Sequence, residues 1–151
     1  MLKRRAGGFT LIELIVVIVI LGILAATALP KFMGIQGGAR AAILQGARGS
    51  VASAMNIAYA TQQAQGLASN VSVTLDGVTI SMVNGYPTAT AIFTAAGLSS
   101  DFSGVVSGST TTIQVVNATT PATCSFTYTQ AAGGTAPPVV GVISPAAVAS
   151  C

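Results

Sequence analysis

The chain has 151 residues, of which 52% are hydrophobic and only 6% are charged, with a formal net charge of +3 at pH 7. Soluble globular domains usually carry about 25% charged residues, so this composition excludes an ordinary cytosolic domain. Lys3, Arg4 and Arg5 supply the whole positive excess, and the remaining residues are neutral as a set, which leaves little electrostatic affinity for nucleic acid or anionic lipid.

The inventory of reactive side chains argues against catalysis. The chain has no His, and residues 49–151 contain no Lys or Arg and only two carboxylates, Asp76 and Asp101. Acid–base pairs and His-rich metal sites cannot be built from these residues, and two carboxylates are too few for the roughly six to eight oxygen ligands of calcium. We therefore expect no enzymatic activity, no metal site and no cofactor.

The N-terminal region combines a basic segment with a long apolar one. Residues 1–8 are basic, and residues 9–29 form an apolar stretch that is long enough, as a helix, to span about 30 Å of hydrocarbon. The positive residues come first, which predicts a cytoplasmic N-terminus and an outward-facing remainder. Glu13 interrupts the apolar stretch, where an ionised carboxylate costs about 2.5 to 3.5 kcal/mol, so a partner for it is expected.

Two simpler interpretations of this region are open. A secretory signal peptide could be cleaved after Ala26-Thr27-Ala28, although its apolar part would be unusually long and would contain a charge. A plain membrane anchor would explain the length and leave Glu13 without a role.

A third interpretation accounts for the basic leader, the apolar length and the carboxylate together. The segment Gly8-Phe9-Thr10-Leu11-Ile12-Glu13, between a basic leader and an apolar helix, resembles the class III signal of type IV pilins and pseudopilins. The resemblance implies that a membrane prepilin peptidase cleaves between Gly8 and Phe9. It also implies that leader 1–8 is removed, that segment 9–29 remains, and that the new amine of Phe9 is N-methylated.

Cleavage would supply the partner that Glu13 needs. It exposes a positive amine at Phe9, and Glu13, four residues on, could meet this amine in its own chain or in a neighbouring subunit. The resemblance implies the neighbour. An unpaired carboxylate is penalised in an apolar setting, so the pair would select the assembly register more than it would add stability.

Gly22 and Pro30 are predicted weak points of the long helix. Proline removes one backbone hydrogen bond and clashes with the preceding turn, which kinks or opens a helix. The resemblance makes 22–30 a region that unwinds locally in an assembled fibre. A simple bend where the helix leaves the bilayer is the alternative.

Residues 30–63 are predicted to form an amphipathic helix that packs on a sheet. Apolar residues recur there at spacings of three and four; they are Phe32, Ile35, Ala39, Ile43, Ala47, Val51, Met55 and Ala58. Arg40 and Arg48 are expected to be solvated or to contact other subunits.

Beyond Gly66 the pattern changes to short strands. Residues 70–75 and 78–83 alternate around Asp76-Gly77, which predicts a hairpin with a type I′ turn. A turn and a short helix should follow, with Thr88 as N-cap and Gly97 as its end. Segments 110–117 and 123–130 predict two strands, and 139–143 a weaker one.

The expected fold class is α+β. With the resemblance, it is the type IV pilin fold, in which a long N-terminal helix with an apolar first half, kinked near Pro30, packs on a small antiparallel sheet. The globular β domain would comprise residues 64–151.

Cys124 and Cys151 are expected to form a disulfide, because an exported chain meets an oxidising periplasm. The resemblance names the bracketed residues 124–151 the D-region, which is often exposed on the fibre and involved in adhesion.

Two further segments narrow the resemblance to pilins of the mannose-sensitive haemagglutinin (MSHA) class within the type IVa pili. These are Gly85-Tyr86-Pro87-Thr88-Ala89-Thr90 and Cys124-Ser125-Phe126-Thr127-Tyr128-Thr129.

The resemblance implies a structural pilin subunit that polymerises through residues 9–30 into a helical filament. It begins as an inner-membrane precursor and ends in an extracellular pilus used for attachment, adhesion and biofilm formation. The implied partners are other copies, the prepilin peptidase, an inner-membrane assembly platform with its ATPase, the membrane, and a surface or glycan receptor; nucleic acid is not expected. The alternatives are a pseudopilin of a type II secretion system and a minor or competence pilin, and the neutral body argues against the nucleic-acid-binding competence role.

Overall fold

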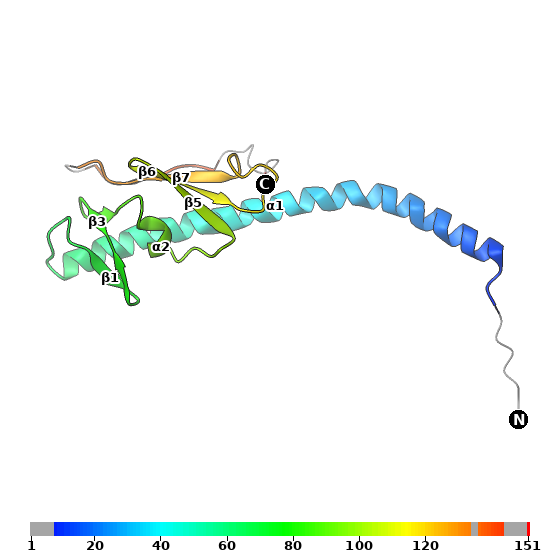
Figure 1. Ribbon diagram of the computed structural model, residues 1–151, viewed down its shortest axis with the longest axis horizontal. Helices are drawn as coiled ribbons and strands as arrows, with labels where there is room; N and C mark the ends of the chain where they lie inside the picture. The colour runs from blue at the N-terminus through cyan, green and yellow to red at the C-terminus, as the bar shows by residue number, and fades with distance from the viewer. Residues whose placement is uncertain (1–7, 134–135, 144–150) are drawn as a thin grey trace, which may run out of the picture. The chain divides into compact units, whose positions relative to one another are not determined.

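The computed structural model describes residues 8–133, 136–143 and 151, and within its long helix the side chains of residues 29–34 lie outside the description. The chain divides into two compact units, one ending at Ile35 and the other running from Gln36 to Cys151. Helix α1, Leu11–Ala64, begins in the first unit and ends in the second (Figure 1). The predicted long helix is therefore confirmed.

Helix α1 ends in a hydrogen-bonded glycine cap. The N–H of Leu67 donates to the carbonyl of Gln62 at 3.1 Å, and the N–H of Gly66 donates to the carbonyl of Gln63 at 3.1 Å. Gly66 has a φ of +63°, which glycine adopts without steric cost. This pair of bonds is the Schellman motif, and it explains why the helical pattern stops at Gly66.

The face that α1 buries differs from the predicted stripe. Ile35 and Ile43 are 64% and 51% exposed and Ala39 is exposed, so the prediction was wrong at these three positions, while the side chain of Phe32 lies outside the description. The second half of the predicted stripe is confirmed: Ala47, Val51 and Ala58 are buried, and Met55 is half-buried against the core. The buried positions are Ala41, Leu44, Ala47, Val51, Ala54, Ala58 and Gln62. Small residues dominate this row, because they let the sheet lie close to the helix.

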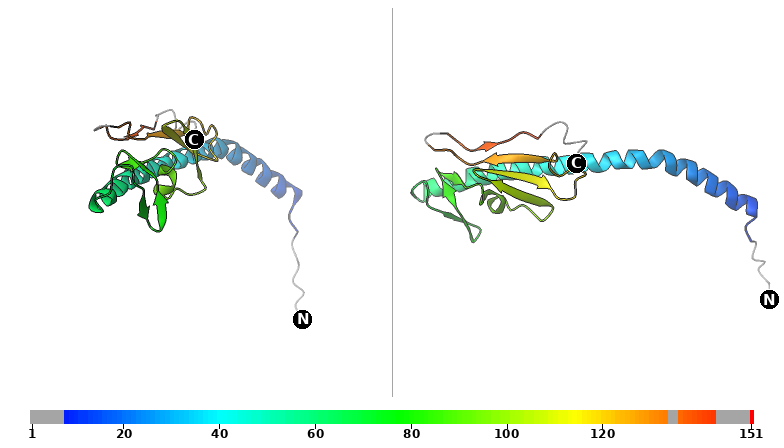
Figure 2. Two further views of the ribbon diagram at one scale, coloured as in Figure 1. Left: turned by 60° about the vertical axis from the view of Figure 1, so that its left-hand side comes forward. Right: turned by 45° about the horizontal axis from the view of Figure 1, so that its top comes forward.

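The second unit carries three small antiparallel sheets rather than the single one expected. Their strands are β1 (Val73–Leu75) with β2 (Val78–Ile80), β3 (Met82–Val83) with β4 (Tyr86–Pro87), and then β5 (Phe102–Ser107), β6 (Thr110–Val115), β7 (Ser125–Thr129) and β8 (Val139–Val140) in that order. Figure 2 shows the four-stranded sheet lying along the part of α1 in this unit.

The predicted hairpin is confirmed, with shorter arms. Leu75 pairs with Val78, and the two turn residues between them, Asp76 and Gly77, have φ values of +47° and +80°. These values suit a type I′ turn. The second arm stops at Ile80, because the chain then starts another hairpin.

That next hairpin was missed from the sequence. Asn84 and Gly85 have φ values of +51° and +88° and join β3 to β4. The short helix α2 (Ile92–Ala95) follows, with Gly97 at φ +60° beyond its end. Thr88 was predicted to be the N-cap of this helix, which is wrong, because the N-cap position belongs to Ala91. The Thr88 hydroxyl instead accepts a hydrogen bond from the N–H of Ala91 and so caps the turn before α2.

The main core joins α1 to the inner face of the four-stranded sheet. Leu44 and Val51 of the helix pack with Ile113, Phe126 and Tyr128 of the strands, and all five are almost fully buried. Burial stabilises the folded state by roughly 1.5 to 3 kcal/mol for each large apolar side chain, so this cluster contributes strongly to the folding of the second unit.

Candidate functional site

The N-terminal end of α1 is organised by Thr10 and Glu13. The Thr10 backbone N–H donates to Glu13 Oε2 at 2.8 Å, and the Thr10 hydroxyl donates to the same oxygen at 2.7 Å. Thr10 precedes the first helical residue, Leu11, and Glu13 lies in the first turn. This is a capping box, in which the N-cap residue and the third helical residue satisfy each other's polar groups.

The capping box gives Glu13 an intrachain partner that was not predicted. The sequence signal was available, because Thr10-Leu11-Ile12-Glu13 has the spacing of a capping box directly before an apolar run. The Glu13 backbone N–H donates in return to the Thr10 hydroxyl at 3.3 Å. Among the described residues, the carboxylate of Glu13 accepts hydrogen bonds through Oε2, and none reaches Oε1.

The helix that follows has the length and composition of a membrane span. Leu11–Ala28 has a mean hydropathy of 2.8, and none of this segment is buried by the rest of the protein. Apolar side chains such as Leu11 (75% exposed) and Ile23 (63% exposed) are left uncovered. Such a surface needs a lipid or protein environment to be stable.

Gly8 and Phe9 lie just before the helix. Phe9 is 92% exposed. A Cβ atom on Gly8 would meet no atom within 4 Å, so packing in this chain does not require glycine there. The rest of the predicted leader, residues 1–7, lies outside the described residues, and cleavage and N-methylation stay predictions.

The helix is continuous through Gly22 and Pro30 in the single chain, and the predicted local unwinding in an assembled fibre stays a prediction. The backbone is helical at both positions, and a Cβ atom on Gly22 would meet nothing within 4 Å. The side chain of Pro30 lies outside the described residues, so the kink predicted there stays a prediction.

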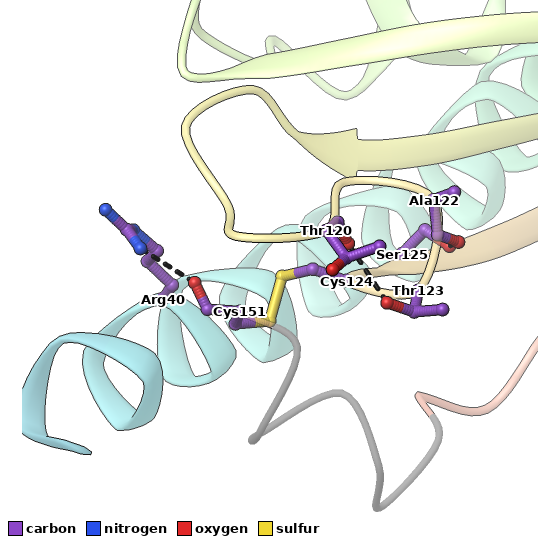
Figure 3. The surroundings of a disulfide bond; sticks show 7 residues. All are labelled: Arg40, Thr120, Ala122, Thr123, Cys124, Ser125 and Cys151. Carbon is purple, nitrogen blue, oxygen red and sulfur yellow. Dashed lines mark hydrogen bonds between the residues drawn. A yellow bond between two sulfur atoms is a disulfide. The ribbon is translucent and has the colours of Figure 1, made fainter. Parts of the chain in front are cut away.

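The disulfide between Cys124 and Cys151 is confirmed. Their Cα atoms lie 5.0 Å apart, and both side chains are almost fully buried (Figure 3). The bridge closes the predicted D-region against the core, while residues 134–135 and 144–150 of that region lie outside the described residues.

Two arginines of α1 hold this C-terminal region by backbone oxygens. Arg40 Nη1 donates to the backbone oxygen of Cys151 at 2.8 Å (Figure 3). Arg48 Nε donates to the backbone oxygen of Gly141, also at 2.8 Å. Both arginines are half-buried and bonded within the chain, so the expectation that they are fully solvated was wrong, while a contact with other subunits stays a prediction. The hydrogen bonds to backbone oxygens offset part of the cost of removing each guanidinium from water.

The residues that the structure describes contain no group of three or more His, Cys, Asp or Glu that could hold a metal ion.

Comparisons with known proteins give one family match and several curated relatives. Residues 3–29 match the family described as the prokaryotic N-terminal methylation motif. The chain is 49% identical over 63 residues to a type IV narrow pilus major component of Thermus thermophilus, which covers 42% of this chain and 53% of the relative. It is 42% identical over 73 residues to a type II secretion system core protein G of Pseudomonas aeruginosa, which covers 44% of this chain and 51% of the relative.

A second type II secretion system core protein G, from Aeromonas hydrophila, is 65% identical over 34 residues, 22% of this chain and 24% of that protein. The chain spans about half the length of the first two curated relatives. No solved structure matches it significantly. The fold agrees with the type IV pilin fold in its long apolar N-terminal helix, its small antiparallel sheets and its C-terminal disulfide.

Proposed function

We propose that this chain is a structural subunit that polymerises through its N-terminal helix into a type IV pilus. The observation that carries the proposal is an uncovered apolar helix, Leu11–Ala28, with a single carboxylate in its first turn. Before assembly the lipid bilayer would cover this helix. In the filament, the helices of other subunits would replace the lipid.

The geometry of Glu13 supports a register-setting contact between subunits. Thr10 donates two hydrogen bonds to Oε2, and no hydrogen bond among the described residues involves Oε1. After cleavage before Phe9, the free amine of a neighbouring subunit could donate to Oε1. A subunit in the wrong register would leave both charges unpaired in an apolar core, at a cost of several kcal/mol. Replacement of Glu13 by Ala should therefore reduce the yield of filament at least tenfold, and normal yield would exclude this role.

Recognition by the prepilin peptidase gives a reason for glycine at position 8. Nothing in the chain would obstruct a side chain there. A protease that binds the extended backbone closely would obstruct one. Gly8→Val should block cleavage while leaving the folded second unit unchanged, and Ala6→Val is the matched control within the leader.

A direct test is to shear fibres from the cell surface and read the subunit's N-terminus by mass spectrometry. The proposal expects a chain that begins at N-methylated Phe9. A chain beginning at Met1 would mean that the leader stays, and one beginning at Leu29 would mean that an ordinary signal peptidase removes the apolar helix. Either result would overturn the proposal.

The pilus is proposed to act in attachment, adhesion and biofilm formation, and the subunit to be of the MSHA type with a surface or glycan receptor. The segments 85–90 and 124–129 support this finer assignment. Deletion of the gene should lower surface attachment, and a deletion strain that attaches normally would contradict it.

The second candidate is a pseudopilin of a type II secretion system, which is favoured by the similarity to two core proteins G. The two candidates differ in where the polymer lies. Long extracellular fibres at normal expression support the pilin, whereas loss of protein secretion on deletion without any surface fibre supports the pseudopilin.

A further inference from the structure

The four-stranded sheet has one long open edge, strand β5. All six residues of β5 pair with β6, from Phe102 opposite Val115 to Ser107 opposite Thr110. Strand β8, at the other side of the sheet, has only two residues. Among the described residues, no backbone hydrogen bond reaches residues 103–107 from any element except β6. Figure 2 shows β5 at the margin of the sheet, with β6 and β7 on its inner side.

The hydrogen-bonding pattern shows which backbone groups of β5 are free. The N–H of Val116 donates to the carbonyl of Asp101 at 2.9 Å, so these two residues form a hydrogen-bonded pair. In an antiparallel ladder such pairs recur at every second residue. Ser103, Val105 and Ser107 therefore bond to β6, while Gly104 and Val106 direct their N–H and C=O groups to the open side.

The edge lacks the features that usually prevent pairing. Natural edge strands are blunted by charged side chains, prolines or bulges. β5 contains only Phe, Ser, Gly and Val, and Val105 and Val106 are 51% and 45% exposed. No charged residue occurs anywhere in residues 102–151. When two copies meet at this edge, the strands of their four-stranded sheets therefore bring no like charges together.

The edge is also complementary to itself. When two copies of Ser103-Gly104-Val105-Val106-Ser107 are aligned antiparallel about Val105, Ser103 faces Ser107 and Gly104 faces Val106. Gly104 and Val106 are the two residues with free backbone groups, so they can exchange hydrogen bonds. The opposed Val105 residues then form a non-hydrogen-bonded pair, in which side chains approach closely.

Packing against α2 explains why residue 104 is glycine. A Cβ atom there would lie 2.9 Å from Cδ2 of Phe93, so the ring of Phe93 requires glycine at this position. The ring covers one face of Gly104, and the backbone N–H and C=O of Gly104 remain at the open edge.

We propose that β5 pairs with β5 of a second copy about a two-fold axis and joins the two sheets into one. A polar helical fibre has no two-fold axis that relates its own subunits, so this contact would join subunits of different fibres, or free subunits. One strand pair buries less surface than a standard interface of about 1,600 Å², so a single pair binds weakly. Many such pairs along two fibres would together hold the fibres side by side. The bundling of fibres rests on the proposed function, whereas the pairing itself does not.

Cysteine cross-linking tests the pairing directly. In the full chain, Val105→Cys would place two thiols on a non-hydrogen-bonded pair, where the Cα distance of about 4.5 Å lies within the range for a disulfide. Val71→Cys is the matched control, because Val71 is 44% exposed and lies outside the four-stranded sheet. Under mild oxidation of detergent-solubilised subunits, we expect at least fivefold more disulfide-linked dimer from Val105→Cys than from Val71→Cys. Equal yields would overturn the proposal.

Charge substitution tests the consequence for fibres. Val105→Lys and Val105→Glu each place two like charges opposite each other, so fibres of either variant alone should lose most lateral bundling in electron micrographs while keeping their length. A mixture of the two fibres should bundle again, which a merely destabilised domain would not do. Bundling that is unchanged in the single variants, or not restored in the mixture, would overturn the bundling role. If the native chain forms no fibres, the proposed function fails, and cross-linking of the solubilised chain still decides whether β5 pairs.

Discussion

Arg48 of α1 donates a hydrogen bond of 2.8 Å from Nε to the backbone oxygen of Gly141, which lies directly after strand β8. The helix thus holds the C-terminal region by a charged donor, 93 residues away in sequence. Arg40 does the same for Cys151. The D-region, which is predicted to be exposed on the fibre, is therefore held at two points by α1, the helix whose first part is predicted to mediate polymerisation.

Replacement of Arg48 by Met should destabilise the second unit by about 1.5 to 3 kcal/mol, the usual range for a hydrogen bond to a charged group. Methionine keeps much of the apolar stem but offers no donor to Gly141. Urea unfolding of the full chain in detergent measures the change. Arg48→Lys keeps the charge and should recover part of the loss, and Ser50→Ala, at an exposed site on the same helix, should change stability by less than about 0.5 kcal/mol. An unchanged free energy of unfolding in Arg48→Met would show that the hydrogen bond to Gly141 does not contribute to stability.

Replacement of both cysteines by Ser should lower the free energy of unfolding by about 3 to 4 kcal/mol. The bridge connects residues 27 positions apart, and its loss releases that loop in the unfolded chain. Chemical reduction of the native chain should produce the same loss, which separates the covalent bond from the change of side chain. If the reduced chain unfolded at the same urea concentration as the oxidised chain, the disulfide would not contribute.

Replacement of Thr10 by Ala should loosen the first turn of α1. The substitution removes the side-chain hydroxyl of the capping box, and loss of an N-cap typically costs about 1 kcal/mol. Amide exchange of Glu13 and Leu14, whose N–H groups donate to Thr10, should become about fivefold faster in detergent micelles, since about 1.4 kcal/mol corresponds to a factor of ten. Thr10→Ser keeps the hydroxyl and should exchange as the native chain does. Equal exchange in Ala and Ser variants would mean that the hydroxyl does not cap the helix.

Local signals predicted much of this fold. The end of the helical pattern near residue 63 and the Asp76-Gly77 turn were predicted correctly, and glycine backbone freedom explains both, through Gly66 and Gly77. The same rule applied to Asn84-Gly85 would have predicted the second hairpin. Its arms are only two residues long, too short for an alternating pattern to be visible.

The features that were missed depend on contacts between distant residues. Strand β5 contains Gly104, which weakens a strand on propensity alone, and the need for glycine comes from Phe93 of α2. The buried face of α1 was misplaced at Ile43 because the sequence offers apolar residues on more than one face. Only the position of the sheet shows that Ala41 and Leu44 face it. No local sequence pattern predicts the hydrogen bonds from Arg40 and Arg48 to two distant backbone oxygens.

Tyr128 links stability to pH through a buried hydroxyl. This hydroxyl donates to the backbone oxygen of Pro87 at 2.7 Å and so joins the four-stranded sheet to the β3–β4 hairpin. Burial, and secondarily the charge of Tyr86, raises the pKa of Tyr128 above its ordinary value. The unfolded chain then releases this proton at about pH 10 while the folded chain retains it.

The contribution of Tyr128 to stability should therefore be complete below about pH 10 and decline as the pH rises further, by up to about 1.4 kcal/mol per pH unit. Tyr128→Phe should cost about 1 to 2 kcal/mol at pH 7, because it removes the hydrogen bond and leaves the Pro87 oxygen without a donor. The two chains should approach each other in stability as urea unfolding is repeated from pH 9 to pH 11. A difference that stayed constant over this range would show that Tyr128 titrates equally in the folded and unfolded chains, and hence that its burial does not hold the proton.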